Sequence, residues 1–163
     1  MAEHTLLTDG PPRTFALVLN TGDAVTDAIV AFAEDNDIEA ASITALGAFR
    51  EATVGFFELE AKEYHEIAVP QQTEVLSLVG DLARDEEGNA ALHAHVVLGL
   101  RDGTTRGGHL LSATTRPTLE VMVTESPTRL RRRYREDLGL ALIDRDGPDE
   151  HRHDDPLRHG LAP

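Results

Sequence analysis

Short runs of apolar residues, often alternating with polar ones and bounded by turn-forming residues, dominate the chain and predict mainly β-strands. The runs cover residues 13–20, 40–49, 52–59, 73–82, 91–100, 104–113 and 117–124. Most neighbouring runs are joined by short turns, so we expect antiparallel pairing. Gly47 and Gly55 lie inside two of the runs and indicate bulges or close contacts. Residues 62–72 are predicted to form a polar loop.

Two stretches have helical spacing instead. The first follows Asp23, a good N-cap, and extends to about residue 35. Its apolar positions are Val25, Ala28, Ile29, Phe32 and Ala33. The second is predicted to begin at Ser126 as N-cap with Pro127 at its first position. Its apolar stripe is Leu130, Tyr134 and Leu138. The expected fold class is therefore α/β of the α+β kind, a single domain with a mostly antiparallel sheet and two flanking helices.

The length of 163 residues suits one domain. We expect residues 1–12 to be an N-terminal extension, 13–143 the domain, and 144–163 a disordered polar tail. No apolar run approaches the roughly 18 residues of a membrane span, and the first residues lack the pattern of a secretory signal. The expected location is cytoplasmic, with no membrane partner.

The net charge of −14 changes the list of expected partners. Duplex DNA binding depends on neutralising phosphates with basic residues, so we expect at most weak DNA binding unless charge is locally asymmetric. The chain contains no cysteine, which excludes disulfides, thiolate metal ligands and thiol nucleophiles. Any metal site must use histidine, aspartate or glutamate.

Three histidines supply candidate ligands. His93 and His95 alternate with apolar residues on one predicted strand, so they share a face about 6.8 Å apart. The position of His109 depends on the turn between the strands. A two-residue turn would place it opposite Val96, on the wrong face. A three-residue turn ending at Gly103, a type I turn followed by a left-handed residue, would place it directly opposite His95.

A three-residue turn therefore predicts a three-imidazole cluster. Such a set suits a divalent transition metal, Zn²⁺ above all but also Fe, Ni or Cu, and leaves a coordination position open. The alternative is that the three side chains are polar residues on a solvated sheet face. Gly107 and Gly108, just before the third histidine, remove side chains and permit a close approach.

The string LHAHVVLGLRDGTTRGGHL resembles the signature of the PPC domain, the plants and prokaryotes conserved domain. The resemblance extends over about residues 13–138. It implies an α/β fold, a homotrimer, and a metal role for His93, His95 and His109. The AT-hook that precedes the plant domain is absent, so this chain resembles the stand-alone prokaryotic type. The plant Gly-Arg-Phe is replaced here by Gln71-Gln72-Thr73, followed by Glu74.

Several other residues have a functional and a structural interpretation. Glu74 lies inside an apolar strand and could act as a general base or as an outer partner of the metal. The alternative is that it makes a structural contact. The same two interpretations apply to Glu120. A basic run could form an anionic-partner surface or pair with surface carboxylates; it consists of Arg129, Arg131, Arg132, Arg133 and Arg135. The tail holds three more histidines that could chelate adventitious metal: His151, His153 and His159.

Three functions remain in view. The first is a homotrimeric metal-binding module that takes a small-molecule or protein ligand at the metal, or regulates a partner. The second, by family analogy, is a DNA-binding regulator. The third is a metal-dependent enzyme in which the metal activates water or polarises a carbonyl. The sequence reveals no substrate, and we expect the first.

Overall fold

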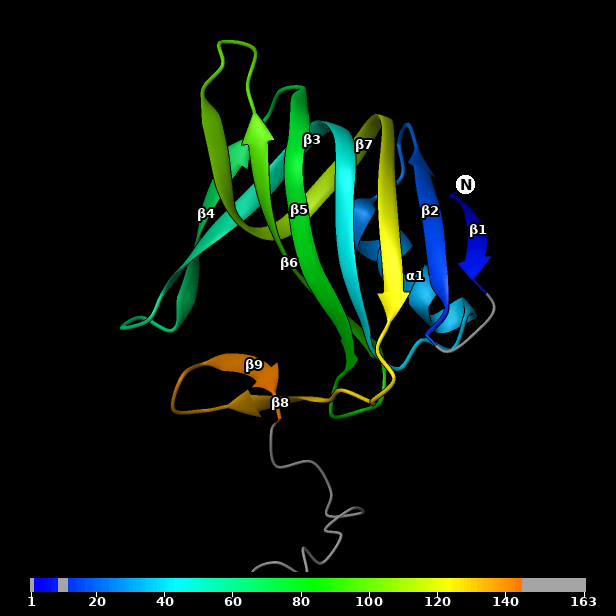
Figure 1. Ribbon diagram of the computed structural model, residues 1–163. Helices are drawn as coiled ribbons and strands as arrows, with labels where there is room; N and C mark the ends of the chain where they lie inside the picture. The colour runs from blue at the N-terminus through cyan, green and yellow to red at the C-terminus, as the bar shows by residue number, and fades with distance from the viewer. Residues whose placement is uncertain (1, 9–11, 145–163) are drawn as a thin grey trace, which may run out of the picture.

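The computed structural model describes residues 2–8 and 12–144. Within them, one seven-stranded antiparallel sheet carries one helix, and a separate two-stranded hairpin follows (Figure 1). The elements are β1 (Glu3–Thr8), β2 (Thr14–Asn20), α1 (Val25–Asp35), β3 (Ala41–Glu58), β4 (Glu63–Val69), β5 (Thr73–Arg84), β6 (Ala90–Gly99), β7 (Thr105–Glu125), β8 (Arg132–Arg135) and β9 (Leu140–Ile143). The predicted tail, apart from residue 144, lies outside the described residues.

The strand order is β1-β2-β7-β6-β5-β3-β4, and β3 also pairs with β7. The pairings β3–β5, β5–β6, β6–β7 and β7–β3 therefore form a closed circuit. The circuit can close because β3 and β7 are long enough to pair with several strands. For example, β7 pairs with β6 near its start and with β2 near its end. Along the way it pairs with β3 from Gly55↔His109 to Ala41↔Glu125. The expected mostly antiparallel sheet is confirmed.

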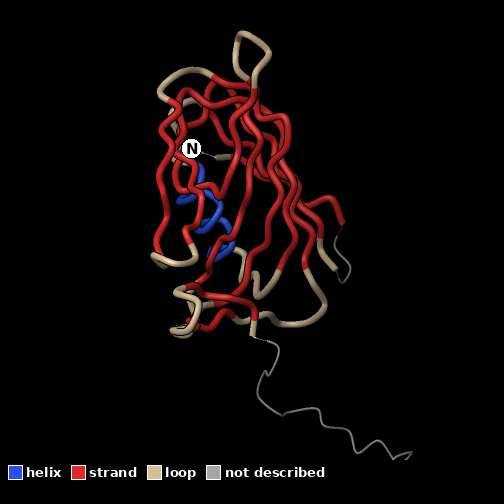
Figure 2. The backbone as a smooth tube through the Cα atoms, turned by 90° about the vertical axis from the view of Figure 1, so that its left-hand side faces the viewer, coloured by secondary structure: helices blue, strands red, loops and turns tan. Residues whose placement is uncertain are grey.

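The core lies between this sheet and α1. The helix packs on one side of the strands, behind β2 and β7 in Figure 1, and Figure 2 shows it in blue among the red strands. Phe32 of α1 meets Phe15 of β2 edge to face, with ring centroids 5.3 Å apart. Ile29 and Val25 are fully buried beside them. Burying each such side chain contributes about 1.5–3 kcal/mol, so the predicted apolar face of this helix is confirmed.

Several sequence-based boundaries are wrong for physical reasons. The two runs at 40–49 and 52–59 form one strand, β3, because the ladder shifts its register rather than ending; one shift falls between Ala45 and Gly47, as expected for a bulge. A Cβ on Gly47 would lie 2.3 Å from the Thr118 carbonyl oxygen. The runs 104–113 and 117–124 are likewise one strand, β7. The predicted loop at 62–72 contains β4, whose polar side chains are tolerated at a sheet edge.

The second predicted helix is wrong: residues 126–143 contain the β8–β9 hairpin instead. The apolar residues of this segment have helical spacing, but its backbone forms hydrogen bonds within the hairpin and to β5 instead of within a helix. The Arg84 amide donates to the Leu130 carbonyl, and Arg84 pairs with Arg131 in a parallel bridge. The Ser126 hydroxyl receives only a long 3.4 Å bond from the Thr128 amide, and caps no helix.

Three smaller points complete the comparison. The N-cap of α1 is Ala24 rather than Asp23, whose carboxylate accepts a hydrogen bond from the Asn20 amide in the preceding turn. Residues 3–8 of the expected N-terminal extension form β1, which pairs with β2. Among the described residues, no helix has the length and apolar character needed to cross a bilayer.

Candidate metal centre

The turn between β6 and β7 has the three-residue geometry. The Leu100 amide donates to the Thr104 carbonyl at 2.8 Å, and the Gly103 amide donates to the Leu100 carbonyl at 2.9 Å. Gly103 has φ +83°, the left-handed value that glycine adopts without strain. The Asp102 carboxylate accepts bonds from the Thr104 amide and hydroxyl, which closes the turn. This turn sets the register His95↔His109, as the three-residue alternative predicts.

The register brings three imidazoles onto one face. One potential ligand atom from each of His93, His95 and His109 lies within 4.8 Å of the other two. The ring centroids are 5.2–5.4 Å apart, with His93 and His109 stacked and His95 edge-on to both. Nitrogens on a tetrahedral zinc ion lie about 3.3 Å apart, so modest side-chain rotations would bring them onto one ion. No other group of this kind occurs within residues 2–8 and 12–144.

The local environment favours the neutral form of two of these imidazoles. Burial, together with the neighbouring His93, His95 and Arg132, lowers the pKa of His109 to about 4. Burial and the Arg132 charge also lower the pKa of His93, although Asp81 opposes this. Neutral imidazoles keep the lone pair that a metal needs. The His109 Nδ1 atom is buried and has no hydrogen-bond partner in the structure, which fits a nitrogen available to a metal ion.

Glycines let the strands around the cluster approach closely. A Cβ on Gly108 would lie 2.6 Å from the Gly55 carbonyl oxygen of β3, and one on Gly107 would lie 2.9 Å from the Val96 carbonyl oxygen. On β5, a Cβ on Gly80 would meet the His93 carbonyl oxygen at 2.3 Å. The close approach expected at the Gly-Gly pair is therefore an approach of neighbouring strands, which fixes the backbone that carries the histidines.

Sequence reasoning missed Tyr64 and Asp81 beside the cluster, and it named Arg132 only as part of a basic run. Tyr64 of β4 packs against the His109 ring with centroids 4.8 Å apart, and burial raises its pKa. Asp81 of β5 lies opposite His93 in the ladder, with Oδ2 3.7 Å from Nδ1. Arg132 of β8 forms an ion pair with Asp81. Only the β5–β6 register could have revealed Asp81, while Tyr64 and Arg132 fell in segments predicted as a loop and a helix.

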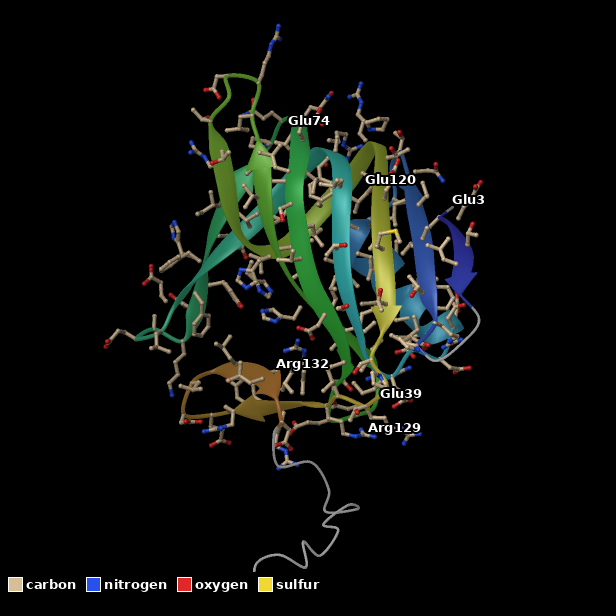
Figure 3. The ribbon with its side chains drawn as sticks, in the orientation of Figure 1. Glu3, Glu39, Glu74, Glu120, Arg129 and Arg132 are labelled. Atoms are coloured by element: carbon tan, nitrogen blue, oxygen red, sulfur yellow. The ribbon has the colours of Figure 1, made fainter. Side chains whose placement is uncertain are left out.

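The structure does not bring the predicted glutamates to the histidines. Glu74 pairs with Gly99 and Ala48, seven residues along β5 from Asp81, which corresponds to about 23 Å of strand. Figure 3 shows Glu74 at the opposite end of the sheet from Arg132. Glu120 of β7 lines an open apolar hollow with Leu46 and Met122 on the sheet face away from α1.

Most of the basic run is paired with carboxylates. Arg129 lies 3.7 Å from Glu39, and Arg135 lies 3.0 Å from Asp137. Arg133 pairs with Asp144 at 3.1 Å. These three contacts match the interpretation in which the arginines neutralise surface carboxylates, whereas the Asp81–Arg132 pair is largely buried. The tail histidines lie outside the described residues.

Comparison with known proteins agrees with this picture. A search of curated proteins finds no match. Among solved structures, a metal-containing protein from Archaeoglobus fulgidus is 34% identical with a TM-score of 0.75, covering 88% of this chain and 97% of that one. A plant- and prokaryote-conserved protein from Pyrococcus horikoshii is 28% identical with a TM-score of 0.76, covering 87% and 94%. A Bacteroides thetaiotaomicron protein, provisionally named DNA-binding, is 29% identical with a TM-score of 0.79, covering 86% and 96%.

The sequence pattern of one family covers most of the chain. The Plants and Prokaryotes Conserved (PCC) domain matches residues 7–127. This range includes all three clustered histidines and the turn that aligns them. It confirms the resemblance drawn from the His-x-His and Gly-Gly-His strings. The chain belongs to the Plants and Prokaryotes Conserved domain family.

Proposed function

We propose that the protein is a homotrimeric metal-binding module in which His93, His95 and His109 hold one divalent transition-metal ion, zinc by preference. The observation that carries the proposal is the convergence of three ligand nitrogens within 4.8 Å. Three imidazole ligands without a carboxylate or thiolate ligand suit zinc and leave a coordination position open. That position would take a small-molecule or protein ligand, so the expected role is regulatory.

The relative from A. fulgidus that is named metal-containing supports the proposal. When bound, the ion would supply a Lewis acid at the open position. The chain's own residues would hold it, orient it and limit its access to solvent. Tyr64, packed on the His109 ring, covers one side of the cluster.

Metal content after dialysis tests the site. The tail histidines should first be replaced by glutamine in every protein compared, because they could chelate metal independently. That background protein should retain about one zinc ion per chain. His95→Ala in the same background should lose most of it, because two imidazoles hold zinc poorly. Equal retention by both would refute the site. His65→Ala is a matched control, since His65 lies on β4 outside the cluster.

An exposed apolar surface supports self-association. It lines one open hollow on the sheet face away from α1 and consists of Leu46, Leu76, Val79 and Met122. Leu46 is 61% exposed, and contiguous exposed apolar side chains of this kind mark interaction sites. We expect a trimer by light scattering coupled to size exclusion. A monomer at micromolar concentration would refute this part of the proposal.

DNA binding is the second candidate, supported by the provisional name of the B. thetaiotaomicron relative. The net charge of −14 and the paired arginines oppose it. We expect at most weak, salt-sensitive binding to duplex DNA in a fluorescence titration near physiological salt. Submicromolar, sequence-selective binding would favour the DNA-binding function instead.

A further inference from the structure

One carboxylate, that of Asp81, lies beside the His93 ring. Asp81 is the direct cross-strand partner of His93, and its Oδ2 atom is 3.7 Å from the His93 Nδ1 atom. Its other oxygen, Oδ1, accepts a hydrogen bond from Arg132 Nη2. The three side chains thus form a chain from β6 through β5 to β8.

Arg132 is buried for a charged side chain. It is only 7% exposed, although it belongs to a short hairpin at one end of the molecule. Figure 3 shows it close to the sheet, on the side where the hairpin meets the long strands. Its Nη1 atom donates a long 3.4 Å bond to the Ala141 carbonyl. Burying a guanidinium is costly unless it is paired, so the contact with Asp81 stabilises its position.

The hairpin itself is tied to the sheet at two further points. The Arg84 amide donates to the Leu130 carbonyl at 2.9 Å. The Lys62 ammonium donates to the Glu136 carbonyl at 2.7 Å. These bonds hold both ends of the β8 segment, so the guanidinium of Arg132 reaches Asp81 from a fixed base.

This arrangement has a direct consequence for metal binding. A histidine that ligates a metal usually donates its other ring N–H to a carboxylate, which fixes the tautomer and the ring orientation. Asp81 Oδ2 lies 3.7 Å from Nδ1 of His93, so a small side-chain rotation would let it accept a hydrogen bond from the Nδ1 N–H and leave Nε2 for the metal. Asp81 is 27% exposed and could rotate on its own, whereas the bond to Arg132 holds it in place.

We propose that Asp81 and Arg132 act together as positioning residues that orient His93 for the metal, which makes the β8–β9 hairpin part of the metal centre. This inference rests on the proposed metal-binding function. The hairpin follows the last residue matched by the family pattern, residue 127. The hairpin thus lies outside the family pattern, and it acts on His93 only through the contact of Arg132 with Asp81.

The test is the zinc affinity of the full-length chain with its three tail histidines replaced by glutamine, measured by competition with a chromophoric chelator. Asp81→Asn and Arg132→Gln should each weaken zinc binding about 10- to 100-fold, the usual effect of losing an outer partner of a ligand. The double variant should be little weaker than the single variants, because both act through one contact. Arg132→Lys should bind with intermediate affinity, since lysine keeps the charge but not the fork.

Arg133→Gln is the matched control. Arg133 is the next residue on β8, is 60% exposed, and pairs with Asp144 rather than Asp81. Its replacement should change zinc affinity less than twofold. If Arg132→Gln fails to fold by circular dichroism, Asp81→Asn decides the question with the same measurements, because its replacement keeps a similar shape and can still contact Arg132.

A second readout separates positioning from general stability. In the metal-free protein, ¹⁵N shifts of the His93 ring should show a proton mainly on Nδ1, and Asp81→Asn should redistribute it toward Nε2. Wild-type affinity and an unchanged tautomer in Asp81→Asn would overturn the inference. If instead the background protein with its tail histidines replaced and His95→Ala in that background bind zinc equally, the proposed metal site itself fails, which is a different outcome.

Discussion

Replacing His109 by glutamine should make the metal-free protein less sensitive to acid. His109 is half-buried, and its pKa in the folded chain is about 4 instead of 6.5. Below pH 6.5 the unfolded chain therefore binds a proton that the folded chain refuses. Stability then decreases as the pH falls from 6.5 to 4, and the full penalty is present only below pH 4. At pH 7 the ring is neutral in the folded chain and mostly neutral in the unfolded chain, so its titration costs little.

The size of the effect follows from the two pKa values. Each pKa unit corresponds to about 1.4 kcal/mol, so the difference between 6.5 and about 4 would give about 3.4 kcal/mol in full. The ring is partly exposed, however, and solvent screens its interactions with the neighbouring charges. We therefore expect a contribution of about 1–2 kcal/mol near pH 4.

This contribution of His109 can be measured by urea unfolding in the presence of a chelator. The measurements are made at pH 7.0 and 4.5 and at equal protein concentrations. The wild-type chain should lose about 1–2 kcal/mol more stability between these pH values than His109→Gln. Any effect of the glutamine on packing is the same at both pH values and cancels. Equal losses, or a larger loss in the variant, would show that burial does not hold this imidazole neutral.

Three further predictions concern packing and assembly. Gly108→Ala should lower the urea midpoint and weaken zinc binding, because the new Cβ would lie 2.6 Å from a β3 carbonyl oxygen; an unchanged midpoint would contradict this. Leu98→Ala, at a position with no exposed surface, should cost about 2–5 kcal/mol in the same assay, and a loss below about 1 kcal/mol would contradict the assigned core. Leu46→Glu should convert the proposed trimer to smaller species on size exclusion while the dialysed protein retains as much zinc as the wild type; a persistent trimer would exclude this sheet face as the interface.

Local chemistry made the histidine cluster predictable. The alternation around His93 and His95, and a glycine in the right place at Gly103, are properties of neighbouring residues. The choice between two turn lengths was the one open step, and the structure has the three-residue turn. The first helix was predictable for the same reason, since its apolar face is a pattern of period 3.6 in its own sequence.

The remaining parts depend on contacts between distant segments. Asp81 becomes the neighbour of His93 only through the β5–β6 register, and Arg132 reaches it from a hairpin whose sequence has helical spacing. The edge strand β4 is too polar to read as a strand, yet it supplies Tyr64. Glu74, by contrast, attracted attention because of its apolar surroundings, but its strand position places it far from the histidines.

The placement of all three histidines on one hairpin also has a kinetic consequence. A β-hairpin closes in about 1–10 μs because its ends are near in sequence. The β3–β7 ladder must instead join Ala41 to Glu125, and such distant pairings make folding slow. The three histidines can therefore meet before the long strands β3 and β7 have paired. An ion captured at that stage would tie β6 to β7 early, and we expect zinc to accelerate refolding in stopped-flow experiments as well as to stabilise the finished fold.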